Sequence, residues 1–457
     1  MSRKSGNRFS EEDMRQPKKL ARNMIVMVIG GGIGGLTAAL SLHAAGIDVR
    51  VYESVADIRR FGVGINLQPN AVRELIELGL GGALAATAIE TAELGYYNRH
   101  GQLIWSESRG LAAGYAWPQY SIDRGDLQMI LLDAVKQRIG AANVFTGHHL
   151  VSFEQDDRGV TARFIDRRRG GQPLPPQTGD ALIGCDGLHS ATRAQLHPNE
   201  GAPVWSGRIQ WRGVVEAEPF LDGRTHTTMG FSGRRAVVYP ISKTAADRGR
   251  SRINWVTTLA DPAGERAAWD RVTWDRGVCK DRFFHRFKDW NFDWIRFADL
   301  ISRTDDIYEY PVYDRDPLPR WSFGRVTLLG DAAHPMWAIG AQAGSQAIVD
   351  ARVLALALAT APAPERALEQ YEAQRRPAMN AVTLQNRKFG PAIVMELAEQ
   401  RAPNGFKRIE DVITHRELAD IANAYKVAAG FDPQELNSRP SLSVPRFRSP
   451  HHGQGTR

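Results

Sequence analysis

The chain has 457 residues, of which 24% are charged and 43% hydrophobic, and its formal net charge is +7. This length allows two or three domains with a large buried core. Seven basic and three acidic residues give residues 1–22 a charge of +4, and three arginines give residues 440–457 a charge of +3, so the body between them is neutral. Because no basic patch interleaved with aromatic residues occurs, we expect solvated tails and no nucleic-acid partner.

Apolar runs and cysteines indicate the compartment. No run approaches the roughly 18 apolar residues of a membrane span, and the N-terminal tail lacks the roughly 7–15-residue apolar stretch of a secretory signal. Two cysteines, Cys185 and Cys279, are too few for a disulfide framework or a metal cluster. We therefore expect a cytoplasmic protein with no metal site and no membrane partner.

The first elements in chain order form a βαβ unit. A strand, a helix and a second strand are predicted at residues 24–29, 33–45 and 48–52. The glycines of the first turn fit G-x-G-x-x-G. Gly30 permits the tight turn, Gly32 lets the backbone approach a pyrophosphate, and Gly35 lets the helix pack closely on the strand. A lone match is weak, but this one follows an apolar strand and opens a helix, so it predicts a dinucleotide site.

The helix start and the end of the second strand would hold the rest of the nucleotide. Free N–H groups at Ile33 and Gly34 would face the phosphates. The carboxylate of Glu53 would accept hydrogen bonds from ribose hydroxyls and would repel a 2′-phosphate.

A second motif, Gly184-Cys185-Asp186-Gly187, lies in the middle of the chain. Before it we expect helices at 70–78 and 125–139, a hairpin at 149–165 and a buried strand at 181–184. Two interpretations of the motif stay open. The favoured one is a strand end, a turn and a helix capped by Ser190. The other is a backbone surface beside the cofactor, with Arg193 supplying charge.

The hydrophobic pattern of the sequence changes between residues 205 and 310. Alternating segments predict a mostly antiparallel sheet, with strands at 208–217, 225–231, 235–241 and 252–259. Six of the eleven tryptophans lie between Trp211 and Trp294. Such a cluster favours a core over a ligand cage, yet this sheet is the best candidate to face a substrate.

A third motif follows at Gly330-Asp331-Ala-Ala-His334-Pro. Asp331 lies where a strand ends, which is the ligand crevice of a parallel sheet, and it could bond a polyol chain such as ribityl. Small residues from Gly340 to Gln346 offer backbone N–H groups at a helix start, which could stabilise negative charge on a flavin ring. For His334 we favour a structural or flavin-adjacent role over a catalytic one. Helices are predicted at 342–358 and from 363 to about 428.

The three motifs in this order resemble the single-component FAD-dependent aromatic hydroxylases, the para-hydroxybenzoate and salicylate hydroxylase group, over roughly residues 24–390. Two further stretches match, Gly62–Ala71 and Tyr120–Gln128. The resemblance implies that Gly64 lies near the flavin ring and that Arg124 and Gln128 touch the cofactor. It assigns the remaining cofactor contacts to Gly30, Gly32, Ile33, Gly34, Gly35, Glu53, Asp186, Asp331 and Gly344.

Within this family, the chain is most similar to the flavin hydroxylases of phenazine pathways. The shared stretches are Gly62–Pro69, Trp211–Val214, Tyr239–Ser242, Tyr313–Pro319 and Gly340–Ala347. One departure concerns the flavin loop, which reads Gly340-Ala-Gln-Ala-Gly344 where many members have Gly-Gln-Gly.

The fold implied is α/β: a Rossmann-like FAD domain with a parallel sheet, an inserted mostly antiparallel substrate-binding sheet, and C-terminal helices. The expected boundaries are a disordered basic tail at 1–22, an FAD-binding domain at 23–92, 120–204 and 308–362, a substrate-binding domain at 93–119 and 205–307, C-terminal helices at 363–430 and a flexible tail at 431–457.

The resemblance implies a monooxygenase. NADH or NADPH would reduce FAD, and O₂ would then form a flavin C4a-hydroperoxide that hydroxylates an aromatic or heteroaromatic small molecule, decarboxylatively in some cases. The pocket candidates are Tyr239 and Arg212, with Trp337 in the loop beside them, although a structural role for the first two is equally open. An arginine there would favour an aromatic carboxylate through a bidentate pair.

Other functions fit the sequence less well. A flavin epoxidase or a Baeyer–Villiger-type oxygenase acting on a polycyclic natural product would share every motif and is the alternative. A flavin halogenase needs a Trp-x-Trp-x-Ile-Pro segment, and a serine hydrolase needs Gly-x-Ser-x-Gly; the chain has neither. A non-enzymatic FAD-binding module is the weakest alternative. Both a monomer and a homodimer are compatible with the sequence.

Overall fold

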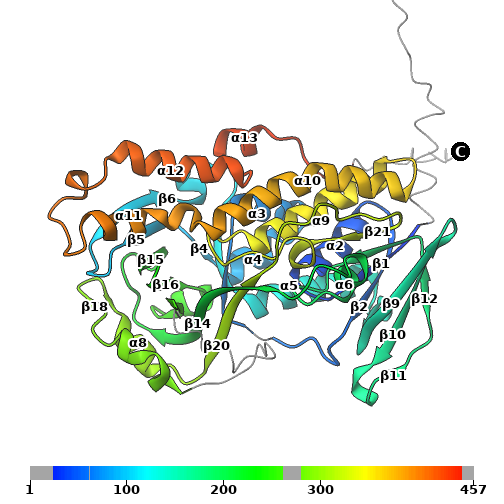
Figure 1. Ribbon diagram of the computed structural model, residues 1–457, viewed down its shortest axis with the longest axis horizontal. Coiled ribbons are helices and arrows are strands. Elements are labelled where there is room, and N and C mark those ends of the chain that lie inside the picture. The colour runs from blue at the N-terminus through cyan, green and yellow to red at the C-terminus, as the bar shows by residue number, and fades with distance from the viewer. Residues whose placement is uncertain (1–23, 61, 261–278, 445–457) are drawn as a thin grey trace, which may run out of the picture.

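A five-stranded parallel sheet forms the centre of the FAD-binding half. The computed structural model describes residues 24–60, 62–260 and 279–444, and the strand order of this sheet is β21-β13-β1-β2-β8 (Figure 1). The strands are β1 (Ile25–Ile29), β2 (Asp48–Glu53), β8 (Val144–Thr146), β13 (Ala181–Gly184) and β21 (Val326–Leu328). Side chains alternate along a strand, so β1 buries Val26 and Val28 on one face and Met27 and Ile29 on the other. The continuous apolar run of β1 follows from this burial on both faces.

Helices cover one face of this sheet and a second sheet covers the other. On the Val26 face, α2 (Ile33–Ala44) packs against α5 (Arg124–Ile139) and α9 (Ala343–Thr360). The opposite face packs against a four-stranded antiparallel sheet of β9 (His148–Asp156), β10 (Gly159–Asp166), β11 (Gln172–Pro173) and β12 (Gln177–Gly179). The predicted hairpin at 149–165 is confirmed, because β9 and β10 pair antiparallel.

The substrate half is a seven-stranded sheet in the order β20-β14-β17-β16-β15-β5-β6. Its strands are β5 (Glu93–Tyr97), β6 (Leu103–Ser108), β14 (Val204–Ala217), β15 (Thr225–Phe231), β16 (Arg234–Pro240), β17 (Ser251–Ala260) and β20 (Ile307–Asp314). All neighbours pair antiparallel except β15 and β5, as the alternation predicts. One face buries Trp211 and Trp255 among phenylalanines, so these tryptophans are core residues rather than a ligand cage.

Smaller elements join the two halves. A three-stranded sheet is formed by β3 (Gly64–Leu67), β7 (Tyr120–Asp123) and β4 (Ile89–Glu90). The remaining elements before the C-terminal helices are α3 (Pro69–Glu77), α4 (Gly81–Thr87), α6 (Ala191–Leu196), α7 (Lys243–Ala246), α8 (Phe297–Arg303), β18 (Asn291–Phe292) and β19 (Ile295–Arg296). The expected helix at 70–78 begins at Pro69, whose fixed φ suits a first helical position.

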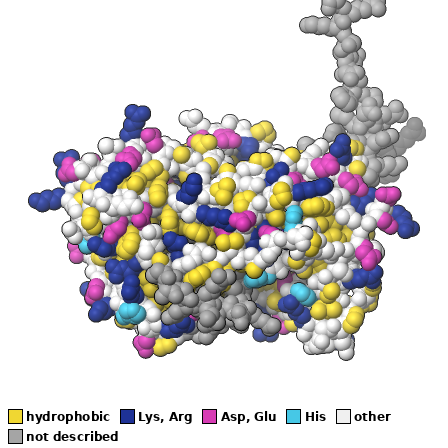
Figure 2. Space-filling view, viewed as in Figure 1, with side chains coloured by type: hydrophobic (Ala, Val, Ile, Leu, Met, Phe, Trp, Pro, Cys, Tyr) yellow, Lys and Arg dark blue, Asp and Glu magenta, His cyan; other side chains and the backbone are white. Residues whose placement is uncertain are grey.

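The C-terminal helices run along the upper edge of the molecule in Figure 1. They are α10 (Pro364–Arg387), α11 (Ile393–Arg401), α12 (His415–Ala428) and α13 (Pro433–Ser438). Among the described residues, α9 alone is long and apolar enough for a membrane span, but 78% of it is buried inside the protein, as expected for a core helix. On the face shown in Figure 2, Lys and Arg intermingle with Asp and Glu, without an extended area of one sign.

Two expected boundaries are wrong. β20 was expected in the FAD-binding domain from residue 308, but it pairs antiparallel with β14 and is the edge strand of the substrate sheet. Residues 431–444 were expected in a flexible tail, but they contain α13 and bury Phe431 and Leu436 against the main core. The Arg73 guanidinium also donates to the backbone carbonyl of Leu436. The expected basic tail at 1–22 lies outside the described residues.

The burial of α13 generates a stability prediction. We expect Leu436→Ala to lower the free energy of unfolding by about 2–5 kcal/mol, because Leu436 is fully buried and its truncation leaves a cavity. The exposed neighbour Gln434 provides the control Gln434→Ala, which we expect to change it by no more than about 0.5 kcal/mol. Chemical denaturation measures both. Equal stability of the two variants would show that this segment does not pack in solution.

Candidate active site

The glycine turn after β1 has one position that faces open space. A side chain at Gly30, whose φ is +113°, would collide with the carbonyl oxygen of Cys185, and one at Gly35 would collide with that of Gly30. A Cβ added to Gly32, by contrast, meets no atom within 4 Å. The packing of the fold therefore requires the first and third glycines, whereas the second leaves room beside the start of α2. This open backbone surface fits a pyrophosphate at a helix N-terminus.

Two of the expected cofactor residues hold this turn in place. The Gly31 N–H donates to Glu53 Oε2 over 2.7 Å, and Gln128 Nε2 donates to the Gly31 carbonyl over 2.9 Å. The other oxygen of Glu53 accepts from the Val55 N–H. Glu53 is only half-buried at the end of β2, so its carboxylate retains room for further acceptor contacts. The contacts fix the shape of the turn without any ligand.

The Asp186 motif is a helix cap, as the favoured interpretation predicted. Asp186 accepts from Ser190 Oγ over 2.5 Å and from the Thr192 N–H over 3.0 Å, and Ser190 caps α6 through the Arg193 N–H. Arg193 is 1% exposed and pairs with Glu200. It also donates to the carbonyls of Ala332 and Ala333, both over 3.0 Å. Its charge therefore connects the second motif to the third and is not directed to a cofactor.

The third motif presents a carboxylate in a recess. Asp331 lies in the turn after β21, and its side chain reaches solvent although protein surrounds it. Burial raises the pKa of this carboxyl, and the nearby His334 and Arg124 lower it. The Arg124 backbone N–H donates to the Val63 carbonyl, but its side chain makes no hydrogen bond or ion pair with any described residue. Asp331 and Arg124 are thus available at one place, as two cofactor contacts would need to be.

His334 has a structural role, in agreement with the favoured interpretation. It is buried, and its Nε2 lies 2.6 Å from Oδ2 of Asp350, which also binds Arg375 over 2.6 Å. Both Arg375 and His334 lower the pKa of the Asp350 carboxyl against the opposing effect of burial. This buried network ties the Gly330 turn to α9 and α10.

The two loops expected beside the flavin ring contact each other. The Gln68 N–H donates to Ser345 Oγ over 3.0 Å, and Gln68 Nε2 donates to the Gly340 carbonyl over 3.1 Å. A Cβ at Gly344 would lie 2.8 Å from Ile65. These contacts place the N-terminus of α9 directly against β3.

β3 in turn lies against the polar face of the substrate sheet. The Gly64 N–H donates to Asn254 Oδ1 over 2.7 Å, and a Cβ at Gly64 would lie 2.5 Å from the Tyr239 ring. Tyr239 is buried and hydrogen-bonded to Asn66, and burial raises the pKa of its phenol, which therefore stays protonated at neutral pH. Asn254 Nδ2 is buried and lacks a hydrogen-bond partner among the described residues. Gly64 and Tyr239 thus meet at the junction of the two halves.

Arg212 lies on the same polar face. Its guanidinium is 5.6 Å from the centre of the Tyr310 ring, and Nη2 donates to Gln210 over 3.0 Å. Its Nε is buried without a hydrogen-bond partner, and no carboxylate among the described residues pairs with it. Burial lowers the pKa of Arg212, while Tyr239 and Tyr310 raise it. A half-buried cation without an acid partner among the described residues suits an anionic ligand.

Trp337 packs at the far end of this face, where Arg208 lies 5.3 Å from the centre of its ring. Its Nε1 is buried and has no hydrogen-bond partner among the described residues. Sequence reasoning missed three further polar residues here, Arg208, Arg235 and Asn254. Along their strands these residues alternate with residues that face the tryptophan core, and this alternation was the available signal. The sequence of a single strand does not show which of its two faces the core covers.

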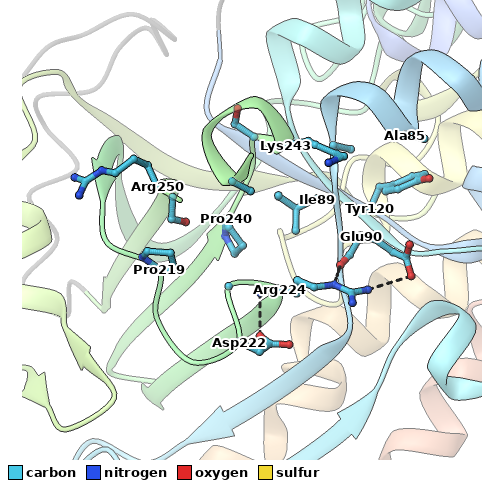
Figure 3. Close-up of a pocket in the computed structure, with 15 residues that line it drawn as sticks. Ala85, Ile89, Glu90, Tyr120, Pro219, Asp222, Arg224, Pro240, Lys243 and Arg250 are labelled. Carbon is cyan, nitrogen blue, oxygen red and sulfur yellow. Dashed lines mark hydrogen bonds and ion pairs between the residues drawn. The ribbon is translucent and has the colours of Figure 1, made fainter. Parts of the chain in front are cut away.

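A surface cavity of about 480 Å³ lies elsewhere, between α4, α7 and the loop at Pro219–Arg224 (Figure 3). Among the charged groups drawn there, Arg224 binds Glu90 over 3.1 Å and Asp222 accepts from the backbone of Arg224. Lys243 and Arg250 pair with Asp247 and Glu218, which are not drawn. None of the expected cofactor or substrate residues lines it. The candidate active site is therefore the junction of β3, α9 and the polar sheet face.

The glycine turn, the carboxylate of Asp331 and the adjoining antiparallel sheet fit a dinucleotide-dependent enzyme, and comparisons with known proteins give its class and family. Residues 23–386 match the family described as "FAD binding domain", and the chain belongs to it. It is 48% identical over 368 residues to phenazine 1,6-dicarboxylic acid hydroxylase PhzS of Lysobacter antibioticus, covering 79% of this chain and 89% of that protein. It is 32% identical to 3-hydroxybenzoate 6-hydroxylase 1 of Aquipseudomonas alcaligenes, covering 77% and 84%.

A solved structure agrees with this family. HpxO of Klebsiella pneumoniae, complexed with FAD and uric acid, superposes with a TM-score of 0.71 at 26% identity, over 89% of this chain and 98% of that one. The expected α/β fold with a parallel sheet and the expected family are confirmed. The protein is an FAD-dependent aromatic hydroxylase.

The open position in the glycine turn generates a binding prediction. We expect Gly32→Val to raise the dissociation constant of FAD at least about tenfold, because its side chain would fill the space left for the pyrophosphate. Fluorescence titration of the apoprotein with FAD measures this. Gly82 in α4 also has no atom near an added Cβ, so Gly82→Val serves as a control that should bind FAD like the wild type. Unchanged affinity in Gly32→Val would place the pyrophosphate elsewhere.

Proposed function

We propose that this enzyme hydroxylates a heteroaromatic carboxylate of the phenazine class, using O₂ and either NADH or NADPH. The carrying observation is the half-buried Arg212, whose Nε is buried without a hydrogen-bond partner and whose guanidinium no acidic side chain among the described residues neutralises. A substrate carboxylate would supply the missing partner. The 48% identity to a phenazine dicarboxylic acid hydroxylase supports the ring system.

The residues of the cofactor site fit FAD. In this proposal, Gly32, Ile33 and Gly34 hold the pyrophosphate, Glu53 the ribose and Asp331 the ribityl chain, with Arg124, Gln128 and Asp186 around them. Gly64 and Gly344 lie beside the flavin ring. FAD supplies the activation of O₂, with electrons taken from the nicotinamide cofactor.

The substrate face would orient the ring and keep water away. Arg212 binds the carboxylate. At the junction with β3, Tyr239 presents its protonated phenol and Asn254 its amide N–H group. Trp337 supplies an apolar wall at the opposite end. No general base is needed in this scheme, because the protein contributes orientation and exclusion of solvent.

Assays of the purified enzyme test the reaction. With phenazine carboxylates we expect faster oxidation of NADH or NADPH, and a product that has gained one oxygen atom or has exchanged its carboxyl group for a hydroxyl. Mass spectrometry distinguishes the two outcomes. Nicotinamide oxidation that yields only hydrogen peroxide, with no oxygenated product from any aromatic carboxylate, would refute the proposal. We also propose that the enzyme acts in the cytoplasm. Both a monomer and a homodimer fit the proposal.

Arg212 gives a sharper test of substrate binding. We expect Arg212→Gln to weaken the binding of an aromatic carboxylate about 10–100-fold, since a hydrogen bond to a charged group contributes about 1.5–3 kcal/mol. Binding of a neutral phenazine without a carboxyl group should change less than about threefold. Titrations followed by flavin absorbance measure both ligands. A similar loss for the two ligands would assign Arg212 a structural role instead.

A further inference from the structure

The polar face of the substrate sheet carries two more arginines besides Arg212. On β14, Arg208, Gln210 and Arg212 alternate onto this face. Gln210 is paired with Thr258 of β17, which is paired with Arg235 of β16. Measured along the strand direction, Arg235 is therefore displaced from Arg212 by two residues, which corresponds to about 7 Å.

Arg235 is exceptional among the buried arginines. Five arginines are buried in the part of the chain that the structure describes. Four of them pair with a carboxylate, namely Arg73, Arg109, Arg193 and Arg352. Arg235 is 6% exposed, and its side chain makes no hydrogen bond or ion pair with any described residue. A buried charge without a partner is costly, so its retention indicates a partner from outside the chain.

The surroundings of Arg235 add positive charge. Burial, together with the charges of Arg208 and Arg212, lowers the pKa of its guanidinium to about 10 against the opposing effect of Tyr96. Arg208 packs 4.8 Å from the centre of the Phe389 ring and 5.3 Å from that of Trp337, and its Nε is buried without a hydrogen-bond partner. Glu107, on β6 three strands away in the sheet, is already bound by Arg109 and Lys426. Burial lowers the pKa of Arg208 and Glu396 opposes this effect, while Glu396 also accepts from the Ser232 N–H. Arginines therefore outnumber acids at this end of the face, which is flanked by aromatic rings.

We propose that Arg235, assisted by Arg208, forms a second carboxylate-binding position, so that the pocket takes a planar aromatic dicarboxylate held at both ends. One carboxylate pairs with Arg212 and the other with Arg235, while Trp337 and Phe389 flank the second end. Arginine suits this role because its planar fork matches a carboxylate and stacks on aromatic faces. The inference rests on the proposed function and specifies its substrate as a dianion.

Binding to the oxidised, FAD-loaded enzyme tests this position without turnover. The probes are phenazine-1,6-dicarboxylate and phenazine-1-carboxylate, titrated against flavin absorbance. We expect Arg235→Gln to raise the dissociation constant of the dicarboxylate at least about 10-fold and that of the monocarboxylate less than about threefold. Arg212→Gln should weaken both acids. Arg235→Lys, which keeps the charge, should retain most of the preference for the dicarboxylate.

Arg234 provides the matched control. It is the adjacent residue on β16, but it points to the opposite face, where its guanidinium lies 5.1 Å from the centre of the Trp290 ring. We expect Arg234→Gln to bind both acids like the wild type. FAD content and melting temperature verify that each variant is folded.

The outcomes separate this inference from the proposed function. Wild-type enzyme that binds and hydroxylates the monocarboxylate as well as the dicarboxylate would overturn the second position and leave the proposed function standing. Equal losses for the two acids in Arg235→Gln, or no loss for either, would do the same. Binding of neither acid by the wild type would overturn the proposed function and this inference together.

Discussion

The contact between β3 and the substrate sheet determines how the two halves of the site are placed. Gly64 brings backbone directly against Tyr239 and Asn254, and its N–H is held by Asn254 Oδ1 over 2.7 Å. No side chain fits at this position, so the approach depends on glycine. Four residues later, Gln68 binds Ser345 and Gly340 at the start of α9. One short strand therefore positions both the expected flavin loop and the polar sheet face, and neither can move without the other.

The two halves treat buried charge in opposite ways. Around the cofactor motifs, buried ions are neutralised within the protein: Arg193 by Glu200, and Asp350 by Arg375 with His334 beside it. These pairs stiffen the turns that would hold FAD, and they leave Asp331 and Arg124 available. On the substrate face, Arg212 and Arg235 lack an acid partner among the described residues. The rigid half is thus internally satisfied, whereas the substrate half is completed by its ligand.

Local patterns in the sequence were sufficient for much of this architecture. The βαβ start, the hairpin, the alternating strands and the three motifs depend on neighbouring residues, and all appear in the structure. What failed depends on partners distant in the chain. The partner of β20 is β14, about a hundred residues earlier, and α13 is held by Arg73 across most of the chain. For the second motif, the favoured helix cap was correct, but the partners of Arg193, Glu200 and the Ala332 carbonyl, are recognisable only in the folded chain.

Arg235 illustrates the same limit most directly. Arg234 and Arg235 are adjacent in the sequence, and residue type alone does not show which of the two faces the substrate. The register of β16 on β17 decides, because it sends Arg234 toward Trp290 and Arg235 to the polar face. That register is fixed from the other side of the sheet, where Trp211 and Trp255 pack on Phe283 and donate hydrogen bonds to Glu309 and Thr304. A shift of one residue would bury arginines among tryptophans and expose the core. The aromatic core therefore does more than stabilise the sheet, since its packing selects which arginines face the substrate.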